Sequence, residues 1–230
     1  MKNQEAISLL IDKLNHFQSE GFIIEPTNEG LSFNKTNGET NYKFGVRILR
    51  NPEHSRLVSI NAGINFKEIE QAIIPILQKA EIVGQSMNHN TSITIGINSE
   101  EDLFSKMKLQ DDKLPIEIRQ EDDTEKVAKL IRNTYDEILT QFFKRYHTTE
   151  DLFLKIKDKS YRDIASIITT GGVFKYFFLA DKFNKTETEE KMKLWLNGID
   201  NAVENNPDEI QYKRFMNAGK ILANKLKYAM

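Results

Sequence analysis

The chain has 230 residues, enough for one large domain or two small ones, and 39% of them are hydrophobic, too many for a disordered chain. It contains no cysteine, which excludes disulfides, thiolate catalysis and cysteine-ligated zinc, and fits a reducing compartment. Its 32 basic and 34 acidic residues give a formal charge of −2, which argues against a broad phosphate-binding surface. The first residues lack the basic start and long apolar run of a secretory signal, so we expect a cytoplasmic protein.

The first 110 residues show a helix followed by alternating strands. Residues 2–20 repeat apolar side chains at helical spacing, and Gly21 is suited to end that helix. Asn37-Gly38 indicates a hairpin turn, because both residues tolerate a positive φ. Period-two alternation predicts half-buried strands in 31–34, 42–48, 58–65 and 92–98. A helical stripe interrupted by Pro75 lies between the third and fourth of these strands.

Beyond residue 125 the apolar period is helical to the end of the chain. The stretch Ile164–Ala180 is apolar apart from its Ser and Thr residues and Lys175. It is short for a membrane span, carries a charge and is broken by Gly171-Gly172, so we expect two packed helices instead of a membrane segment. Trp195 lies on the apolar stripe of a later helix and is expected to be largely buried.

These patterns predict an α+β fold with an N-terminal antiparallel sheet of about four strands, flanking helices and a C-terminal helical half. At least three antiparallel strands are expected within 30–66, and essentially no strand after residue 125. The predicted organisation is an α+β domain over 1–110, an acidic connection over 111–125 and a helical domain over 126–230. The sequence leaves open whether the two halves pack as one unit.

The sequence carries no recognisable catalytic or metal-binding motif. Its four histidines lie in separate segments, at His16, His54, His89 and His147. They form no HxH or HExxH pair, so a histidine metal site would have to be assembled by the fold. The acidic run 111–123 lacks the DxDxDG spacing of a calcium loop, and Gly171-Gly172 lacks the Lys-Ser/Thr pair of a phosphate loop. We therefore predict no catalytic residue, no metal and no cofactor.

The polar side of the predicted sheet is the candidate functional surface. Gly45, Gly63 and Gly96 lie on it, and glycines inside strands often mark close approach by a ligand or another backbone. The predicted partner-binding residues on this side are Arg47, Asn61, Asn65, Thr94 and Asn98. Arginine suits the role, since its fork of donors can hold an acidic group at two points. The alternatives are a hydrated outer face, or a face covered by the C-terminal helices.

The order of elements in residues 1–110 resembles that of known small proteins. The helix ending in Gly21-Phe22, the strands around Phe33 and Phe44, and the run 60–64 are similar to small bacterial α+β domains of unknown function, some of them toxin-immunity proteins. The order of helix, three strands and helix also resembles secretion-chaperone-like folds. Both resemblances imply binding without chemistry. Richness in Lys, Asn and Ile favours an AT-rich bacterial genome.

The function predicted first is therefore a non-enzymatic cytoplasmic protein that binds another protein, in an immunity-like or chaperone-like role. One alternative is an enzyme with a scattered site between the two halves, using His89 or His147 beside acids. A second alternative is nucleic-acid binding through the C-terminal basic helix, which carries Lys213, Arg214, Lys220, Lys225 and Lys227. Nearly balanced charge argues against nucleic acid as a partner, and no membrane partner is expected.

Overall fold

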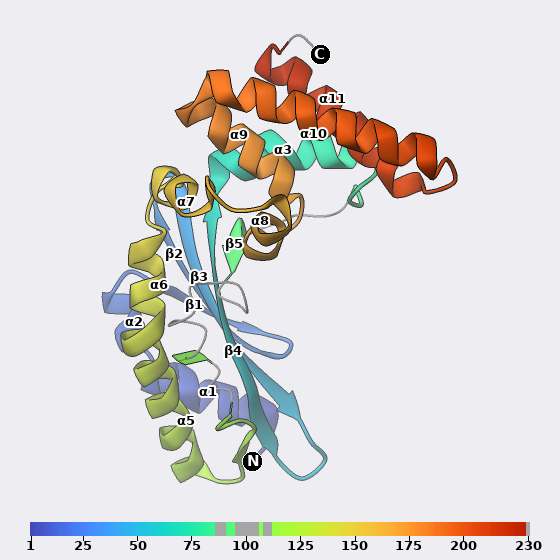
Figure 1. Cartoon of the computed structure of the whole chain (residues 1–230). Helices are drawn as coiled ribbons and strands as arrows, with labels where there is room; N and C mark the ends of the chain where they lie inside the picture. Colours follow the sequence, from blue (N-terminus) through green and yellow to red (C-terminus); the bar gives the residue numbers. More distant parts are fainter. Residues whose placement is uncertain (86–90, 95–105, 108–111, 229–230) are drawn as a thin grey trace. The chain divides into compact units, whose positions relative to one another are not determined.

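The computed structural model describes residues 1–85, 91–94, 106–107 and 112–228 (Figure 1). The chain forms two compact units: unit 1 comprises 1–65 and 93–147, and unit 2 comprises 66–92 and 148–230. Each unit therefore combines two separate segments of the chain. The linear division into 1–110 and 126–230 stays a prediction about domains, and the compact units do not follow it.

Unit 1 is built on the predicted antiparallel sheet, which confirms the α+β fold. The strands follow the order β1-β2-β3-β4-β5, and β6 also pairs with β4. Their bounds are β1 Ile23–Thr27, β2 Gly30–Asn37, β3 Thr40–Arg50, β4 Ser55–Phe66, β5 Ile93–Thr94 and β6 Ile116–Ile118. The predicted alternations correspond to β2, β3, β4 and β5. Strands β1 and β6 were not predicted, because β1 is largely exposed and contains a proline, and β6 has three residues.

The β2–β3 hairpin sets the register of the sheet. Asn37 lies opposite Thr40, so the two-residue loop is Gly38-Glu39, one position later than the predicted turn. Gly38 has a φ of +57°, which glycine adopts without strain because it has no side chain. This register places Phe33 directly opposite Phe44, and their rings stack at 4.1 Å between centroids.

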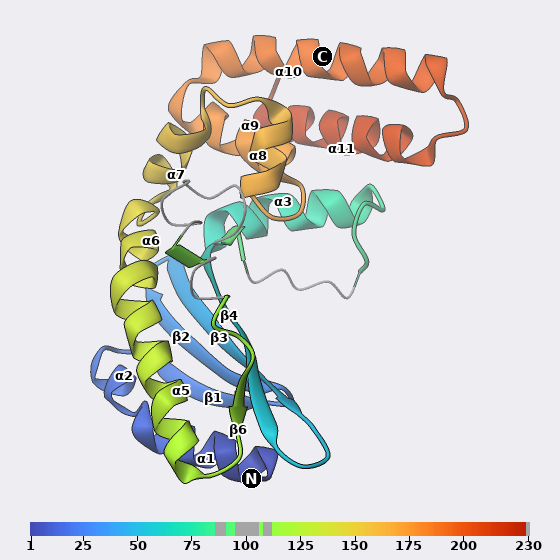
Figure 2. The same cartoon turned by 60° about the horizontal axis from the view of Figure 1, so that its bottom comes forward.

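The buried face of this sheet packs on helices through aromatic side chains. Phe17, in α2 (His16–Ser19), lies 5.3 Å from Phe33, 5.4 Å from Phe44 and 4.8 Å from Tyr135, between ring centroids. All four rings are less than a tenth exposed. Figure 2 shows α1 (Asn3–Lys13), α5 (Glu121–Thr134) and α6 (Thr140–Arg145) alongside the sheet. The contacts join chain segments that are about a hundred residues apart.

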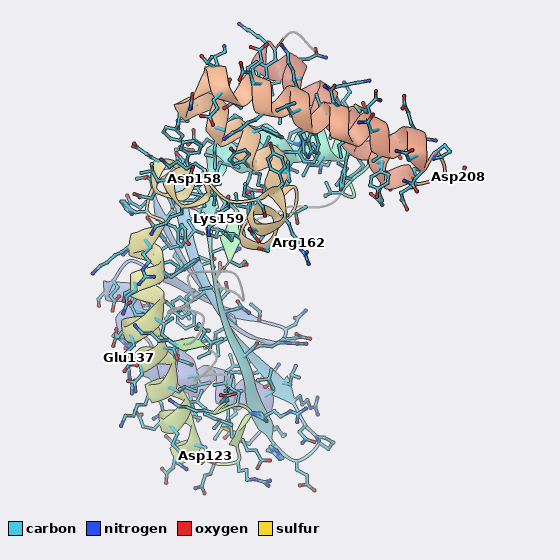
Figure 3. All side chains as sticks on the ribbon, viewed as in Figure 1. Asp123, Glu137, Asp158, Lys159, Arg162 and Asp208 are labelled. Atoms are coloured by element: carbon cyan, nitrogen blue, oxygen red, sulfur yellow. The ribbon has the colours of Figure 1, made fainter. Side chains whose placement is uncertain are left out.

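The helical period predicted beyond residue 125 begins as one continuous helix through α5, the π-helical turn Tyr135–Leu139 and α6. The acidic run before it forms the beginning of α5. Asp123 and Gln120 make a capping box, and the side-chain hydrogen bond from Lys126 is the main cause that lowers the pKa of Asp123. Figure 3 labels Asp123 at this helix start, and Glu137 on the side of the helix away from the sheet. The acidic residues 121–123 thus lie in the first turn of α5, where negative charge stabilises the helix.

Unit 2 is helical. Its helices are α3 Lys67–Lys79, α7 Thr149–Ile156, α8 Tyr161–Ile167, α9 Gly172–Phe183, α10 Lys185–Asn205 and α11 Ile210–Leu226. Helix α9 contacts each of the others, as expected for a helix that is apolar nearly all round. In the described range 126–228 the structure contains helices, turns and a single bridge residue, Ile168, which confirms the predicted helical half.

The Gly171-Gly172 pair is the predicted break between two packed helices. Gly171 has a φ of +75°, and a Cβ on it would lie 2.5 Å from Cδ1 of Leu77 in α3. A Cβ on Gly172 would lie 2.9 Å from the Cα of Ala165 in α8. The two glycines therefore let α9 begin close against α3 and α8. Within the described residues, no helix combines the length and apolar character that crossing a bilayer requires.

Trp195 is mostly buried, with a minor part of the residue exposed, which agrees with the predicted burial. The stripe of α10 that faces the core runs through Thr188, Met192 and Leu196, one helical turn apart, and Trp195 lies on its flank. Its ring still packs edge-on against Phe174 of α9, with 5.5 Å between centroids.

We expect Phe17→Ala to lower the free energy of unfolding by about 3–5 kcal/mol, because it removes the ring shared by both layers of unit 1. The matched control is Ile23→Ala in the same unit, where the side chain is 65% exposed and the change should stay within about 0.5 kcal/mol. Urea denaturation followed by circular dichroism measures both. Equal effects of the two substitutions would contradict the assigned core.

Replacing either of two helical glycines of unit 2 by alanine should change the stability of the protein, in opposite directions for the two positions. A Cβ at Gly219 of α11 would lie 2.6 Å from Leu196 Cδ2 and 2.9 Å from Trp195 Cζ3, whereas a Cβ at Gly198 of α10 meets nothing within 4 Å. Gly219→Ala should therefore destabilise by about 1–3 kcal/mol through overpacking. Gly198→Ala should stabilise by about 0.5–1 kcal/mol, since alanine favours a helix. Thermal unfolding of the two variants checks the signs.

Candidate functional site

The polar face of the sheet is defined here as the side opposite Phe33 and Phe44. Strand register places the members of each directly opposed pair on the same side. Glu25 pairs with Ser32, Ser32 with Gly45, and Gly63 with Thr94. The described residues of this face include Ile23, Glu25, Ser32, Asn34, Lys43, Gly45, Arg47, Asn61, Gly63 and Thr94.

Arg47 stands on β3 opposite Gly30, close to the turn that joins β1 and β2. Its Nε donates a 2.7 Å hydrogen bond to Oε2 of Glu29, in that turn. Both side chains are about half exposed, at 50% and 58%. The predicted arginine is therefore accessible, and it is already oriented by one carboxylate of its own chain.

The position of Asn61 explains why residue 45 is a glycine. A Cβ at position 45 would come 2.9 Å from Oδ1 of Asn61, so Gly45 makes room for this amide. Close approach at Gly45 is thus made by a neighbouring side chain, without any ligand. Asn61 itself is exposed, and so is Thr94, which lies opposite Gly63 at the end of the sheet.

The other two predicted binding residues are not exposed within the part of the chain that the structure describes. Asn65 is 6% exposed, because the end of β4 from Ala62 to Phe66 is buried throughout. Asn98 and Gly96 lie outside the described residues. Of the five predicted binding residues, the polar face therefore carries Arg47, Asn61 and Thr94 at its surface. The described helices of unit 1 pack on the aromatic side instead.

Unit 2 contains a buried ionic cluster that the sequence analysis missed. The Nζ of Lys175 in α9 lies 2.7 Å from Oε1 of Glu70 in α3, and the two side chains are 0% and 7% exposed. Ser92 Oγ donates to the same carboxylate oxygen at 2.7 Å and accepts a 2.9 Å hydrogen bond from the backbone N–H of Phe66. The cluster thus joins α9, the start of α3 and the segment before β5.

Burial lowers the pKa of the Lys175 ammonium, and the attraction of Glu70 opposes this shift. A lysine of lowered pKa beside a serine hydroxyl is a combination found in catalysis, but catalysis needs access for a substrate. Lys175, Ser92 and Glu70 are all buried. We interpret the cluster as a structural element. Its sequence signal was a single charged residue among the apolar residues of each of two helices, Glu70 in α3 and Lys175 in α9.

The histidines do not assemble a reactive centre in the described structure. His54 is buried in the β3–β4 turn, with Nε2 3.4 Å from a Glu117 carboxylate oxygen of β6. The Nδ1 of His147 is hydrogen-bonded to the hydroxyl of Tyr42. His89 lies outside the described residues, and among those described no three His, Asp or Glu side chains are grouped to hold a metal ion.

The basic helix α11 is partly engaged by its own unit. Arg214 lies 3.3 Å from the carboxylate of Glu81, and Lys225 donates a 3.0 Å hydrogen bond to the carbonyl of Ala72 in α3. These two cations stabilise the packing of α11, which reduces what the helix could offer to phosphates. Comparison of the chain with protein-family models, curated proteins and solved structures found no match in any of the three. The resemblance of residues 1–110 therefore remains a prediction.

We expect Lys175→Met to destabilise the protein by about 3–5 kcal/mol at neutral pH, because it leaves the Glu70 carboxylate buried without its counter-charge. The double variant Glu70→Gln/Lys175→Met should lose less, since both charges disappear and the glutamine can still accept from Ser92. Urea titrations of the two variants measure the difference. A single variant as stable as the wild type would contradict the burial of this pair.

Proposed function

We propose that this protein acts by binding another protein through the polar face of its sheet, and that it does so without catalysis. The observation that carries the proposal is the exposure of Arg47, Asn61 and Thr94 on one side of a sheet whose described helices pack on the other side. An immunity-like or chaperone-like role in the cytoplasm is the form of this proposal that the sequence resemblance favours.

Arg47 is the proposed centre of the contact. An exposed ion pair such as Arg47–Glu29 contributes at most about 1 kcal/mol, so a carboxylate of the partner can replace Glu29 at little cost. The guanidinium carries five N–H donors, and the bond to Glu29 uses Nε. Arginine is also among the residues enriched at the energetic centres of interfaces.

Other side chains of the polar face offer ordered donors and acceptors. The amide of Asn34 donates to Oε2 of Glu25 at 3.2 Å and to Oγ of Ser32 at 3.0 Å. Groups that are held in place before binding lose less conformational entropy when a partner docks. Ser32 and Gly45 pair at the middle of the face, where the exposed Asn61 lies over Gly45 and offers its amide to a partner.

The test is site-specific photo-crosslinking in cells that produce the protein naturally. We expect p-benzoylphenylalanine at position 61 or 94 to give a discrete adduct with another protein, and Arg47→Glu to abolish it, because the substitution turns attraction for an acidic group into repulsion. The same crosslinker at position 137, on the outer side of the π-helical turn, should give no such adduct (Figure 3).

Glu29→Gln is the matched control for Arg47→Glu. It removes the same ion pair but keeps the cation, so the adduct should persist or increase. If Glu29→Gln abolished the adduct as well, the ion pair would matter for local structure and not for the partner. Adducts of equal yield at position 137, or none at 61 and 94, would refute binding through the polar face.

A further inference from the structure

Unit 1 has a hollow where the start of α1 meets the β1–β2 turn and the end of β3. Its volume is about 670 Å³, within the range of clefts that hold small ligands. Its lining comes from the first turns of α1, from residues 27–29 of the turn and from residues 48–50 of β3. It is called the α1 hollow below.

The wall that the β1–β2 turn forms is fixed by the fold. The carbonyl of Glu29 accepts a 2.6 Å hydrogen bond from the N–H of Ile48, and the N–H of Glu29 donates to Oγ1 of Thr27 at 3.3 Å. Gly30 has a φ of +144°, and a Cβ on it would lie 1.9 Å from the carbonyl oxygen of Val46. The turn is therefore pressed against β3, and a wall that is already ordered lowers the entropic cost of binding.

The α1 hollow carries an excess of positive charge. Lys2 and Arg50 line it, are exposed, and have no ion-pair partner among the described residues. Glu29 is the acid among the described lining residues, and it is paired with Arg47 at 2.7 Å. Glu5, in the first turn of α1, does not line the hollow. An anion here therefore meets two cations that no described side chain neutralises.

Asn3 brings an unused hydrogen-bond acceptor to the same hollow. Its Oδ1 is buried and receives no hydrogen bond within the described structure, and the residue is part of the lining. A buried acceptor without a donor costs free energy, so a ligand that brings an N–H or O–H to this atom is favoured. A ligand that fits the α1 hollow therefore carries a donor as well as a negative charge.

The floor of the α1 hollow is aliphatic. Ile48 is fully buried and Ile7 is 8% exposed, while Leu49 is partly exposed. All three line the hollow. Burial of an apolar group against them is favourable, so the site suits a ligand that has an aliphatic part beside its charge.

We propose that the α1 hollow binds an aliphatic α-amino acid residue with a free carboxylate, as in an N-acyl amino acid or at the C-terminus of a peptide. The carboxylate would pair with Lys2 and with the guanidinium of Arg50, which can hold it at two points. The N–H on the same α carbon would donate to Oδ1 of Asn3, and the side chain would cover Ile7 and Ile48. None of the three proposed contact residues of the polar face lines this hollow, so the two sites are distinct.

The test follows the amide proton–nitrogen correlation spectrum of the full chain during titration with N-acetyl-leucine and with acetyl-Gly-Gly-Leu. We expect saturable shifts of the resonances of residues 2–7, 27–29 and 48–50. Equal affinity of the two probes identifies the single amino acid as the whole ligand, and tighter binding of the peptide identifies a chain end.

Two analogues of N-acetyl-leucine test the contacts of the ligand. The amide N-acetyl-leucinamide lacks the carboxylate, and the ester analogue has an oxygen in place of the N–H. Each should bind about tenfold more weakly, because each loses one of the two polar contacts. Equal binding of either analogue would overturn the proposal, as would the absence of saturable shifts with both probes.

Variants of the protein locate the site. Arg50→Gln should weaken binding of N-acetyl-leucine by about tenfold or more and Asn3→Ala by about fivefold, since a charge-assisted hydrogen bond is stronger than a neutral one. Lys129→Gln, the same loss of charge on exposed α5, should leave the affinity unchanged, and so should Asn61→Ala on the polar face. The spectra show whether each variant keeps its fold. A folded Arg50→Gln variant that binds as the wild type does, or an equal loss in Lys129→Gln, would refute binding in the α1 hollow.

Discussion

The packing of Phe17 and Tyr135 against Phe33 and Phe44 is the constraint on which unit 1 depends. A sheet that must bury one face cannot slip by a single residue, because a slip would send Phe33 and Phe44 to the solvent side. The same packing fixes the other face: once the aromatic rings point to the helices, Arg47, Asn61 and Thr94 must point away from them. The proposed binding surface is thus a consequence of the core.

Unit 2 is held together differently. Its central helix α9 is apolar nearly all round, yet two of its lysines pair with α3: Lys182 with Glu68 at the surface, and Lys175 with Glu70 in a buried pair. Such a pair contributes little net free energy when intact, but a mispacked α9 would leave both charges buried and uncompensated. The pair therefore favours a single arrangement of α3 against α9, and the segment at Ser92 is tied to it by hydrogen bonds to Glu70 and Phe66.

The polar face is produced by residues that belong to separate strands. Asn61 of β4 lies over Gly45 of β3, and Arg47 is oriented by Glu29 in the turn between β1 and β2. This exposed site is shaped by the buried core next to it, so a change in the core would alter binding indirectly.

The sequence by itself determined the α+β class, strands β2 to β4 and the helical half, because period-two and period-3.6 burial are local consequences of one-sided packing. It also placed Arg47, Asn61 and Thr94 on one face, since strand alternation is local. Only the tertiary structure decided the pairing of β6 with β4, the ion pair of Glu70 with Lys175 and the position of Trp195 on the flank of the buried stripe of α10. Each of these depends on contacts between segments that are distant in the sequence. Such contacts do not produce a hydrophobic period within either segment, so the sequence pattern does not reveal them.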